Sequence, residues 1–168
     1  FDWDKLNWLN AQVLHGLSSE LLLSCLRPLW EQRGWQLPAS ADWGLDLCTL
    51  LGPSLTLIED GVDQARPFFE RPGLEADAEK QLEVEGAAAA IKALADALHA
   101  SPWNGDDPAR GQILLADAAK AAGVKKGVIM KSLRAALLGR LQGPDLLTTW
   151  SLLARIGEDL PRLERCLS

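Results

Sequence analysis

The sequence is short of the residues from which metal sites and disulfides are built. Its 168 residues include three cysteines, two histidines and no tyrosine. Cys25, Cys48 and Cys166 lie far apart in apolar runs, which indicates buried free thiols rather than disulfides or a Cys-x-x-Cys metal site. His15 and His99 are isolated from each other and from any cysteine cluster, which argues against structural zinc. We therefore expect no metal site.

Long apolar runs are also absent. No run approaches the roughly 20 residues that a membrane-spanning helix needs. The N-terminal sequence FDWDKLNW has neither the basic start nor the apolar block of a signal peptide. These absences predict a cytoplasmic protein with no membrane partner. Because the first residue is Phe1 rather than methionine, we also expect the chain to be part of a longer one.

Motifs for nucleotide binding and nucleophilic catalysis are missing as well. The sequence has no Gly-x-x-x-x-Gly-Lys-[Ser/Thr] loop and no Gly-x-Gly-x-x-Gly fingerprint. No serine or cysteine occurs in a nucleophile-elbow motif, and the adjacent carboxylates Asp106 and Asp107 are interpreted as a loop and a helix cap. We expect no catalytic residue in this chain, so its chemistry should be that of binding.

The pattern of apolar residues predicts an all-α fold. Trp3, Leu6, Leu9 and Val13 recur at spacings of three and four, the period of an amphipathic helix. No window shows the period of two that a half-buried strand requires. Helices, about eight to ten in all, are expected over 2–17, 18–34, 41–51, 77–100, 108–123, 125–139, 144–157 and from about 160, with one or two short ones in 54–65.

A boundary between two helical bundles is expected where Pro72 and Gly73 interrupt the helical pattern within an acidic region. We predict subdomain 1 over residues 1–72 and subdomain 2, which includes a connecting helix, over residues 73–168. Helix-forming residues, including a run of alanines, dominate residues 77–100. This composition predicts one long helix that joins the two small bundles.

One stretch concentrates positive charge in an otherwise acidic protein. The formal net charge is -6, yet residues 118–144 contain six cationic side chains and no acidic one. A local basic field of this kind attracts phosphate groups even when the net charge is negative. The helix expected from Lys125 to Gly139 therefore predicts a surface that binds a polyanion. The alternative is an ordinary solvated basic face on a surface helix.

The expected faces of this helix separate packing from binding. Four apolar residues share one side, which we expect to be buried: Ile129, Leu133, Ala136 and Leu137. Lys126, Lys131 and Arg134 project elsewhere. An arginine can form a planar, bidentate pair with a guanine or a phosphate, which a lysine cannot. The small Ala135 beside Arg134 permits close approach of a ligand.

With these residues identified, the chain resembles the C-terminal anticodon-binding part of bacterial glutamyl-tRNA synthetase, a class I enzyme, and its details are similar to cyanobacterial members. The resemblance covers essentially the whole chain and rests on FDWDKLNWLN, TLIEDGVDQARPFF and AAGVKKGVIMKSLRAALLGRLQGPDL, in that order. It implies an anticodon-binding helical cage within an enzyme that attaches glutamate to tRNA with ATP. The family's ATP-binding histidine and lysine signatures have no counterpart here. The resemblance thus implies ATP and Mg²⁺ in a missing catalytic part and no cofactor in this one.

The resemblance also implies roles for individual residues. Arg134, in a motif that the family writes Leu-Arg-x-Ala-Leu-Thr-Gly, is implied to contact an anticodon base, and Leu146 is implied to pack near the last anticodon base. Leu138 stands where the family commonly has threonine, which changes the local hydrogen bonds. The other cations of the stretch are expected to position phosphates: Lys120, Lys125, Lys126, Lys131 and Arg140.

A further position bears on which tRNA is accepted. In the family, an arginine follows a Leu-Gly-Pro turn in some enzymes that accept only the tRNA for glutamate, and here that residue is Ser54. A short hydroxyl side chain has neither the bidentate contact nor the bulk of a guanidinium. The resemblance therefore leads to the hypothesis that tRNAs for glutamate and for glutamine are both accepted.

The expected partner is the anticodon arm of tRNA, bound by a monomer that binds neither DNA nor a membrane. The acidity of the chain, together with the absence of a part that contacts the acceptor arm, predicts weak binding by this chain alone. Two alternatives remain. One is a stand-alone helical protein-interaction domain that kept the fold and lost tRNA binding, and the other is an enzyme in its own right.

Overall fold

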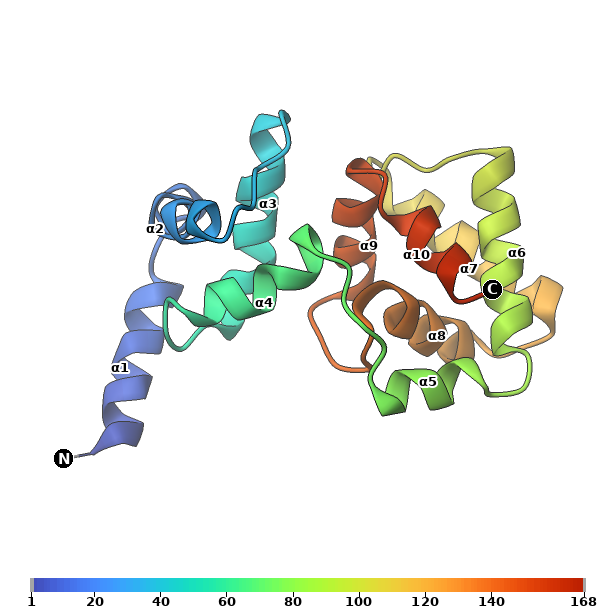
Figure 1. The fold of residues 1–168 in the computed structure, drawn as a ribbon, viewed down its shortest axis with the longest axis horizontal. Helices are drawn as coiled ribbons and strands as arrows, with labels where there is room; N and C mark the ends of the chain where they lie inside the picture. The colour runs from blue at the N-terminus through green and yellow to red at the C-terminus, as the bar shows by residue number, and fades with distance from the viewer. Residues whose placement is uncertain (1, 168) are drawn as a thin grey trace. The chain divides into compact units, whose positions relative to one another are not determined.

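The structure, a computed structural model, describes residues 2–167. Within that range it contains ten α-helices, one 3-10 helix and no strand, so the predicted all-α fold is confirmed (Figure 1). The chain divides into two compact units, the first ending at Glu70 and the second beginning at Arg71. None of the described helices is long and apolar enough to cross a bilayer.

The first unit is organised around aromatic side chains. Its helices are α1 (Trp3–His15), α2 (Ser19–Gln32), α3 (Ala41–Leu51), the 3-10 helix η1 (Gly52–Ser54) and α4 (Asp60–Phe69). Trp30, Trp35 and Trp43 surround Phe69, with ring centroids 5.2, 5.1 and 5.5 Å from its own. The indole Nε1 of Trp30 donates to Gly61 O at 3.1 Å, which satisfies its one polar atom inside the core. Tryptophan is used here as packing material.

The prediction of three buried thiols is wrong for Cys25. The buried stripe of α2 repeats every four residues from Leu22 to Trp30, and Cys25 lies outside it and is exposed. Cys48 on α3 is buried, and this burial raises the pKa of its thiol to about 12. It therefore stays protonated and unreactive at neutral pH. Cys166, in the second unit, is half-buried.

The second unit is organised around α8. Its helices are α5 (Ala76–Leu82), α6 (Ala87–Ala100), α7 (Pro108–Ala122), α8 (Lys126–Leu138), α9 (Leu146–Arg155) and α10 (Asp159–Arg165). Helix α8 contacts all five of the others (Figure 1). Trp150 on α9 is fully buried, with its ring edge-on to that of Trp103 and its Nε1 donating to Asp159 Oδ2 at 3.0 Å. A helix packed on so many sides has little freedom to move within its unit.

The long helix predicted over residues 77–100 is two helices, and neither of them joins the units. Residues 83–86 separate α5 from α6, and both helices belong to the second unit. Gly86 has a φ of +83°, a left-handed conformation, and a Cβ at this position would collide with Val124. The chain enters α5 through the non-helical residues 71–75. Helix propensity predicted helical structure in this region but not the break, which lies where Gly86 packs closely on Val124.

Candidate nucleic-acid interface

The N-terminus of α8 is open to solvent. Helix α7 ends at Gly123, whose φ of +69° is left-handed, and Lys125 then forms the extended N-cap of α8. Lys125 gives the first turn no side-chain cap, and Lys126 and Gly127 are exposed with it. The N–H groups of a first helical turn have no intrahelical acceptor, and the helix dipole favours negative charge beside them. This end of α8 therefore suits an anion such as a phosphate.

The predicted division of α8 into a buried and an exposed side is confirmed. The four residues expected inside are each 0% exposed: Ile129, Leu133, Ala136 and Leu137. Lys126 and Lys131 stand in solvent. The buried Ser132, which the apolar pattern did not single out, donates its hydroxyl to Val128 O at 2.7 Å. The cationic side chains thus project from a helix whose other side is fixed by packing.

Arg134 lies at the border between these two sides. Its side chain is half-buried, and Nη1 donates to Pro144 O at 2.7 Å, in the loop that follows α8. Burial lowers the pKa of the guanidinium, and the nearby carboxylate of Asp145 acts in the opposite direction. Gly143 fits closely here, because a Cβ on it would come within 3.2 Å of Arg134 Nη1. The loop thus holds one edge of the guanidinium, and a half-exposed group with five N–H donors keeps others for a ligand.

Leu146 is placed near this loop but faces inward. It is the first residue of α9 and is 3% exposed. The preceding Asp145 caps the helix, with Oδ2 accepting from Thr148 N at 2.9 Å. Leu138, which stands where the family commonly has threonine, is 4% exposed and packs on the loop at Gly143. What the chain presents around Leu146 is mainly backbone and the polar cap, while the leucine side chain itself is packed against the protein.

The other predicted cations border the same region. Lys120 lies in the last turn of α7 and Arg140 directly after the C-cap of α8, and both are exposed. Arg140 Nε donates to Gln142 O at 3.1 Å, which ties it to the loop. Lys125 and Lys126 lie at the opposite end of α8. The structure therefore collects the predicted cations at the two ends of α8 and along its exposed side.

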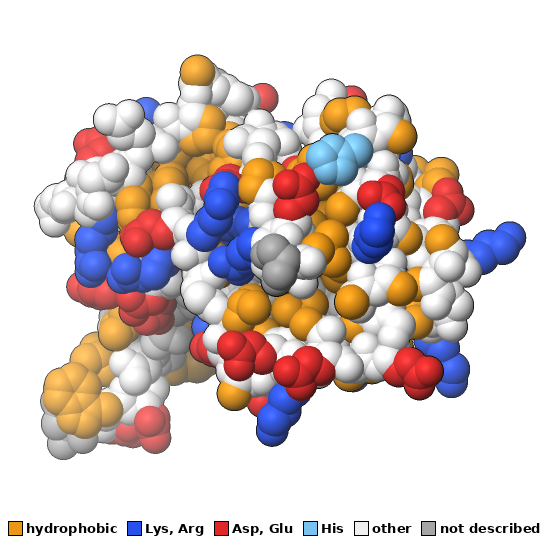
Figure 2. Space-filling model, turned by 45° about the vertical axis from the view of Figure 1, so that its right-hand side comes forward, with side chains coloured by type: hydrophobic (Ala, Val, Ile, Leu, Met, Phe, Trp, Pro, Cys, Tyr) orange, Lys and Arg blue, Asp and Glu red, His pale blue; other side chains and the backbone are white. Residues whose placement is uncertain are grey.

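The cations of this stretch are not neutralised by ion pairs within the part of the chain that the structure describes. None of the six cations of 118–144 forms an ion pair there, whereas Lys92 pairs with Asp96 at 2.9 Å and Arg71 with Glu158 at 2.9 Å. Figure 2 shows one face of the molecule on which Lys and Arg groups are interspersed with Asp and Glu groups. Unpaired cations gathered on one helical hairpin attract a polyanion more strongly than neutralised pairs do.

The sequence reasoning missed two arginines that bind the C-terminal end of α8. Arg162 Nη1 donates to Leu137 O at 2.7 Å, and Arg165 Nη2 donates to Ala136 O at 3.2 Å. Helix α8 has no basic residue in its own last turn. The sequence did contain a signal, since a helix end without a basic residue near it must satisfy its carbonyls from elsewhere. It could not show that the donors come from α10.

Ser54 belongs to the first unit, whereas Arg134 and Leu146 belong to the second. It ends η1 and is exposed, and its Oγ lies 2.9 Å from Leu51 O and 2.6 Å from Gln64 Oε1. A hydroxyl has a single proton, so it can donate to only one of these oxygens at a time. Gln64 is a neighbour that the sequence reasoning did not identify. Ser54 thus offers a small, locally hydrogen-bonded surface.

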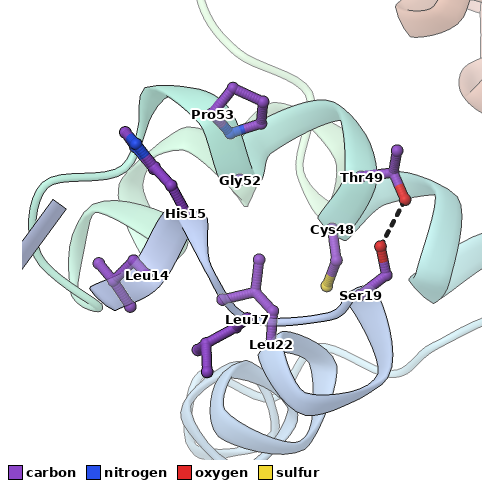
Figure 3. Close-up of a pocket in the computed structure, with 9 residues that line it drawn as sticks. All are labelled: Leu14, His15, Leu17, Ser19, Leu22, Cys48, Thr49, Gly52 and Pro53. Carbon is purple, nitrogen blue, oxygen red and sulfur yellow. Dashed lines mark hydrogen bonds between the residues drawn. The ribbon is translucent and has the colours of Figure 1, made fainter. Parts of the chain in front are cut away.

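A hollow of about 290 Å³ in the first unit borders Gly52 and Pro53, the two residues before Ser54 in the chain (Figure 3). Leucines of α1 and α2 and the buried Cys48 line it together with the Gly52–Pro53 turn. At its rim, Ser19 Oγ lies 2.6 Å from Thr49 Oγ1, and His15 Nε2 lies 3.0 Å from Leu55 O. The hollow is mainly apolar and carries few polar groups. No three histidine, cysteine or carboxylate side chains gather into a metal site anywhere in residues 2–167.

Comparison with known proteins identifies a family and close relatives. A family model described as "Anticodon binding domain" matches residues 20–167. The chain is 67% identical over 168 residues to the glutamate–tRNA ligase of Parasynechococcus marenigrum strain WH8102, and 70% identical over 168 residues to that of Synechococcus sp. strain CC9902. Each match covers 100% of this chain and 35% of the relative, so the chain spans about a third of the length of the curated relatives it matches. The resemblance stated from the sequence is confirmed.

Two solved structures share the fold. One is a glutamate tRNA ligase from Elizabethkingia meningosepticum in complex with its amino acid, with a TM-score of 0.86 and 23% sequence identity. The other is the glutamate-tRNA synthetase from Elizabethkingia anophelis, with a TM-score of 0.79 and 24% identity. Each match covers 99% of this chain and 32% of the other. At this level of identity, the likeness establishes the arrangement of the helices.

Proposed function

The chain belongs to the anticodon-binding domain family, and from this premise we propose that it is the anticodon-recognition part of a glutamate–tRNA ligase. The observation that carries the proposal is the identity of 67–70% over the whole chain to relatives of that name. Identity at this level over the whole chain supports a shared fold and a shared role. The stand-alone protein-interaction domain, the main alternative, is not favoured by these relatives.

Helix α8 and the loop after it form the proposed RNA-binding surface. The half-exposed Arg134 would contact an anticodon base with the N–H groups that the loop leaves available. The N-terminus of α9 beside it would receive the neighbouring nucleotide, with Leu146 supporting that surface from inside. Lys120, Lys125, Lys126, Lys131 and Arg140 would hold the phosphates of the anticodon arm. Phosphate contacts set the register of the RNA, and base contacts give the specificity.

The chemical reaction would take place in another part of the polypeptide. We propose that ATP and Mg²⁺ are bound in the remaining two-thirds of a ligase like the relatives, where glutamate would be attached to tRNA. The present chain would supply recognition of the tRNA alone. We further propose a monomeric, cytoplasmic enzyme that binds neither DNA nor a membrane.

Binding of RNA hairpins tests the proposal. The chain is titrated with the anticodon stem-loop of a tRNA for glutamate, followed by NMR at low salt, with an unrelated stem-loop of equal length as control. We expect weak but selective binding whose chemical-shift changes cluster at residues 125–146, and whose affinity falls steeply as salt is raised. Equal binding of both hairpins, or no binding at low salt, would overturn the proposal and favour a protein-interaction domain.

Relaxed discrimination between two tRNAs is a second proposal, carried by Ser54. Its exposed hydroxyl is within hydrogen-bond distance of Leu51 O and Gln64 Oε1. A hydroxyl cannot form the planar, bidentate pair that an arginine forms. The complete ligase is assayed with tRNAs for glutamate and for glutamine, as the native enzyme and as Ser54→Arg. We expect the native enzyme to charge both and the variant to favour the glutamate tRNA. Strong rejection of the glutamine tRNA by the native enzyme would contradict this proposal.

A further inference from the structure

The C-terminal turn of α8 is held by another helix. The last carbonyl groups of an α-helix have no intrahelical donor and need one from outside. Arg162 and Arg165 of α10 donate to Leu137 O and Ala136 O, at 2.7 and 3.2 Å. These two carbonyls belong to the turn that directly follows Arg134 in α8. The helix end next to the proposed base-reading residue is therefore fixed by two guanidinium groups.

Both arginines use their guanidinium groups for hydrogen bonds inside the protein. Arg162 is 0% exposed. Burial lowers the pKa of its guanidinium to about 10, so it remains charged at neutral pH. Arg165 is half-buried, and its Nη1 donates to Pro72 O at 2.6 Å. The hydrogen bonds from Nη1 and Nη2 to backbone carbonyls offset part of the cost of burying these charges and hold both side chains in one arrangement.

The fixed turn also determines where the loop after α8 begins. Helix α8 ends at Gly139, whose φ of +72° is left-handed, and Gly139 O accepts from Glu75 N at 2.7 Å. The loop then returns, so that Pro144 O meets Arg134 Nη1 at 2.7 Å. The end of α8 therefore positions both partners of this hydrogen bond, Arg134 and Pro144. A displacement of that end would change the direction of the Arg134 guanidinium.

We propose that Arg165, together with Arg162, is a positioning residue for base recognition by Arg134. This inference rests on the proposed function of α8. Arg165 acts from behind the interface, by keeping the last turn of α8 and the following loop in the arrangement that orients the guanidinium. The phosphate-binding lysines lie outside this arrangement and do not depend on it.

A double-mutant cycle tests the inference. The affinity of the chain for the anticodon stem-loop of a tRNA for glutamate is measured for Arg165→Gln, Arg134→Ala and both together, with the exposed Arg27→Gln as matched control. We expect Arg165→Gln to weaken binding about tenfold and to add little once Arg134 is gone, because both act through one contact. The slope of affinity against salt should change little, since the phosphate-binding lysines keep their contacts. Arg165→Lys should restore part of the affinity.

A second variant and a folding measurement distinguish a positioning role from loss of folding. Arg162→Lys keeps the buried charge and should weaken binding in the same salt-independent way, while circular dichroism verifies that each variant is folded. A folded Arg165→Gln that binds like the native chain, or whose effect adds fully to that of Arg134→Ala, overturns the positioning role. A reduced salt slope that persists when Arg140 is replaced by alanine overturns it too, because it indicates a direct phosphate contact of Arg165. Absence of binding by the native chain instead removes the proposed function, and the positioning role with it.

Discussion

Arg134 Nη1 donates to Pro144 O at 2.7 Å, so the guanidinium on α8 is clasped by the loop that leads into α9. This hydrogen bond orients the side chain before any ligand arrives. Pre-orientation of a recognition group reduces the ordering cost at binding. It also means that the arginine has two functions in this structure, one in holding the loop and one in the proposed contact with RNA.

Substitution of Arg134 separates charge from geometry. We expect Arg134→Ala to weaken binding of the anticodon stem-loop by about 1–3 kcal/mol and to relax selection at one base. Arg134→Lys keeps the charge but loses the planar fork, so it should recover some affinity without recovering selectivity. Isothermal titration with native and base-substituted stem-loops measures both quantities. Native-like selectivity of the lysine variant would show that only charge is used.

Lysines at the start of α8 should affect salt dependence rather than selectivity. Lys125 and Lys126 are exposed beside the open N-terminus of α8. We expect each alanine substitution to reduce the slope of log affinity against log salt by about 1, with equal losses for all base variants of the stem-loop. Lys92→Ala, which removes the same charge from an ion pair on α6, is the control and should leave the slope unchanged. Base-dependent losses would contradict phosphate positioning.

Gly139 should be more sensitive than another glycine of similar conformation. Gly139 and Gly123 have left-handed φ values of +72° and +69°. A Cβ on Gly139 would collide with the backbone at Gly73, whereas a Cβ on Gly123 meets nothing within 4 Å. We expect Gly123→Ala to cost about 1–2 kcal/mol of unfolding free energy from conformation alone. Gly139→Ala should cost clearly more, as measured by urea unfolding, and equal losses would refute the close packing of this helix end.

Asp159 gives a pH dependence whose direction follows from its burial. Desolvation raises its pKa above the ordinary value of 3.8, while the hydrogen bond from Trp150 Nε1 acts in the opposite direction. A raised pKa means that its stabilising contribution is complete below the unfolded-state pKa and is lost as pH rises through the folded-state pKa. Asp159→Asn keeps an acceptor for Trp150 and carries no charge. Its stability relative to the native chain should therefore increase from pH 4 to pH 7.

Urea unfolding of both proteins across this range checks the pH prediction. Asp63→Asn, at an exposed position of α4 in the other unit, serves as control and should show no comparable trend. A native chain that gains stability over Asp159→Asn as the pH rises would mean that ionised Asp159 is favoured in the fold. That result would reverse the sign argued here.

Much of the local structure follows from short-range rules. The spacing of Ile129, Leu133 and Leu137 predicted the buried side of α8, because these side chains share one face of a helix. Left-handed glycines such as Gly123 ended helices where the sequence suggested. The failures have a different origin. Cys25 lies in an apolar run yet is exposed, because burial depends on which neighbours pack on a helix and not on the residues beside it in the chain.

The sequence by itself determined the helical class, the basic stretch free of acidic residues and the membership of an anticodon-binding family. These properties are carried by periodicity, charge and motifs, which are local. Only the tertiary structure decided that Gly86 splits the predicted long helix against Val124, that Leu146 faces inward, and that Arg162 and Arg165 hold the end of α8. Each of these depends on residues far apart in the chain, whose contacts form only when the helices pack.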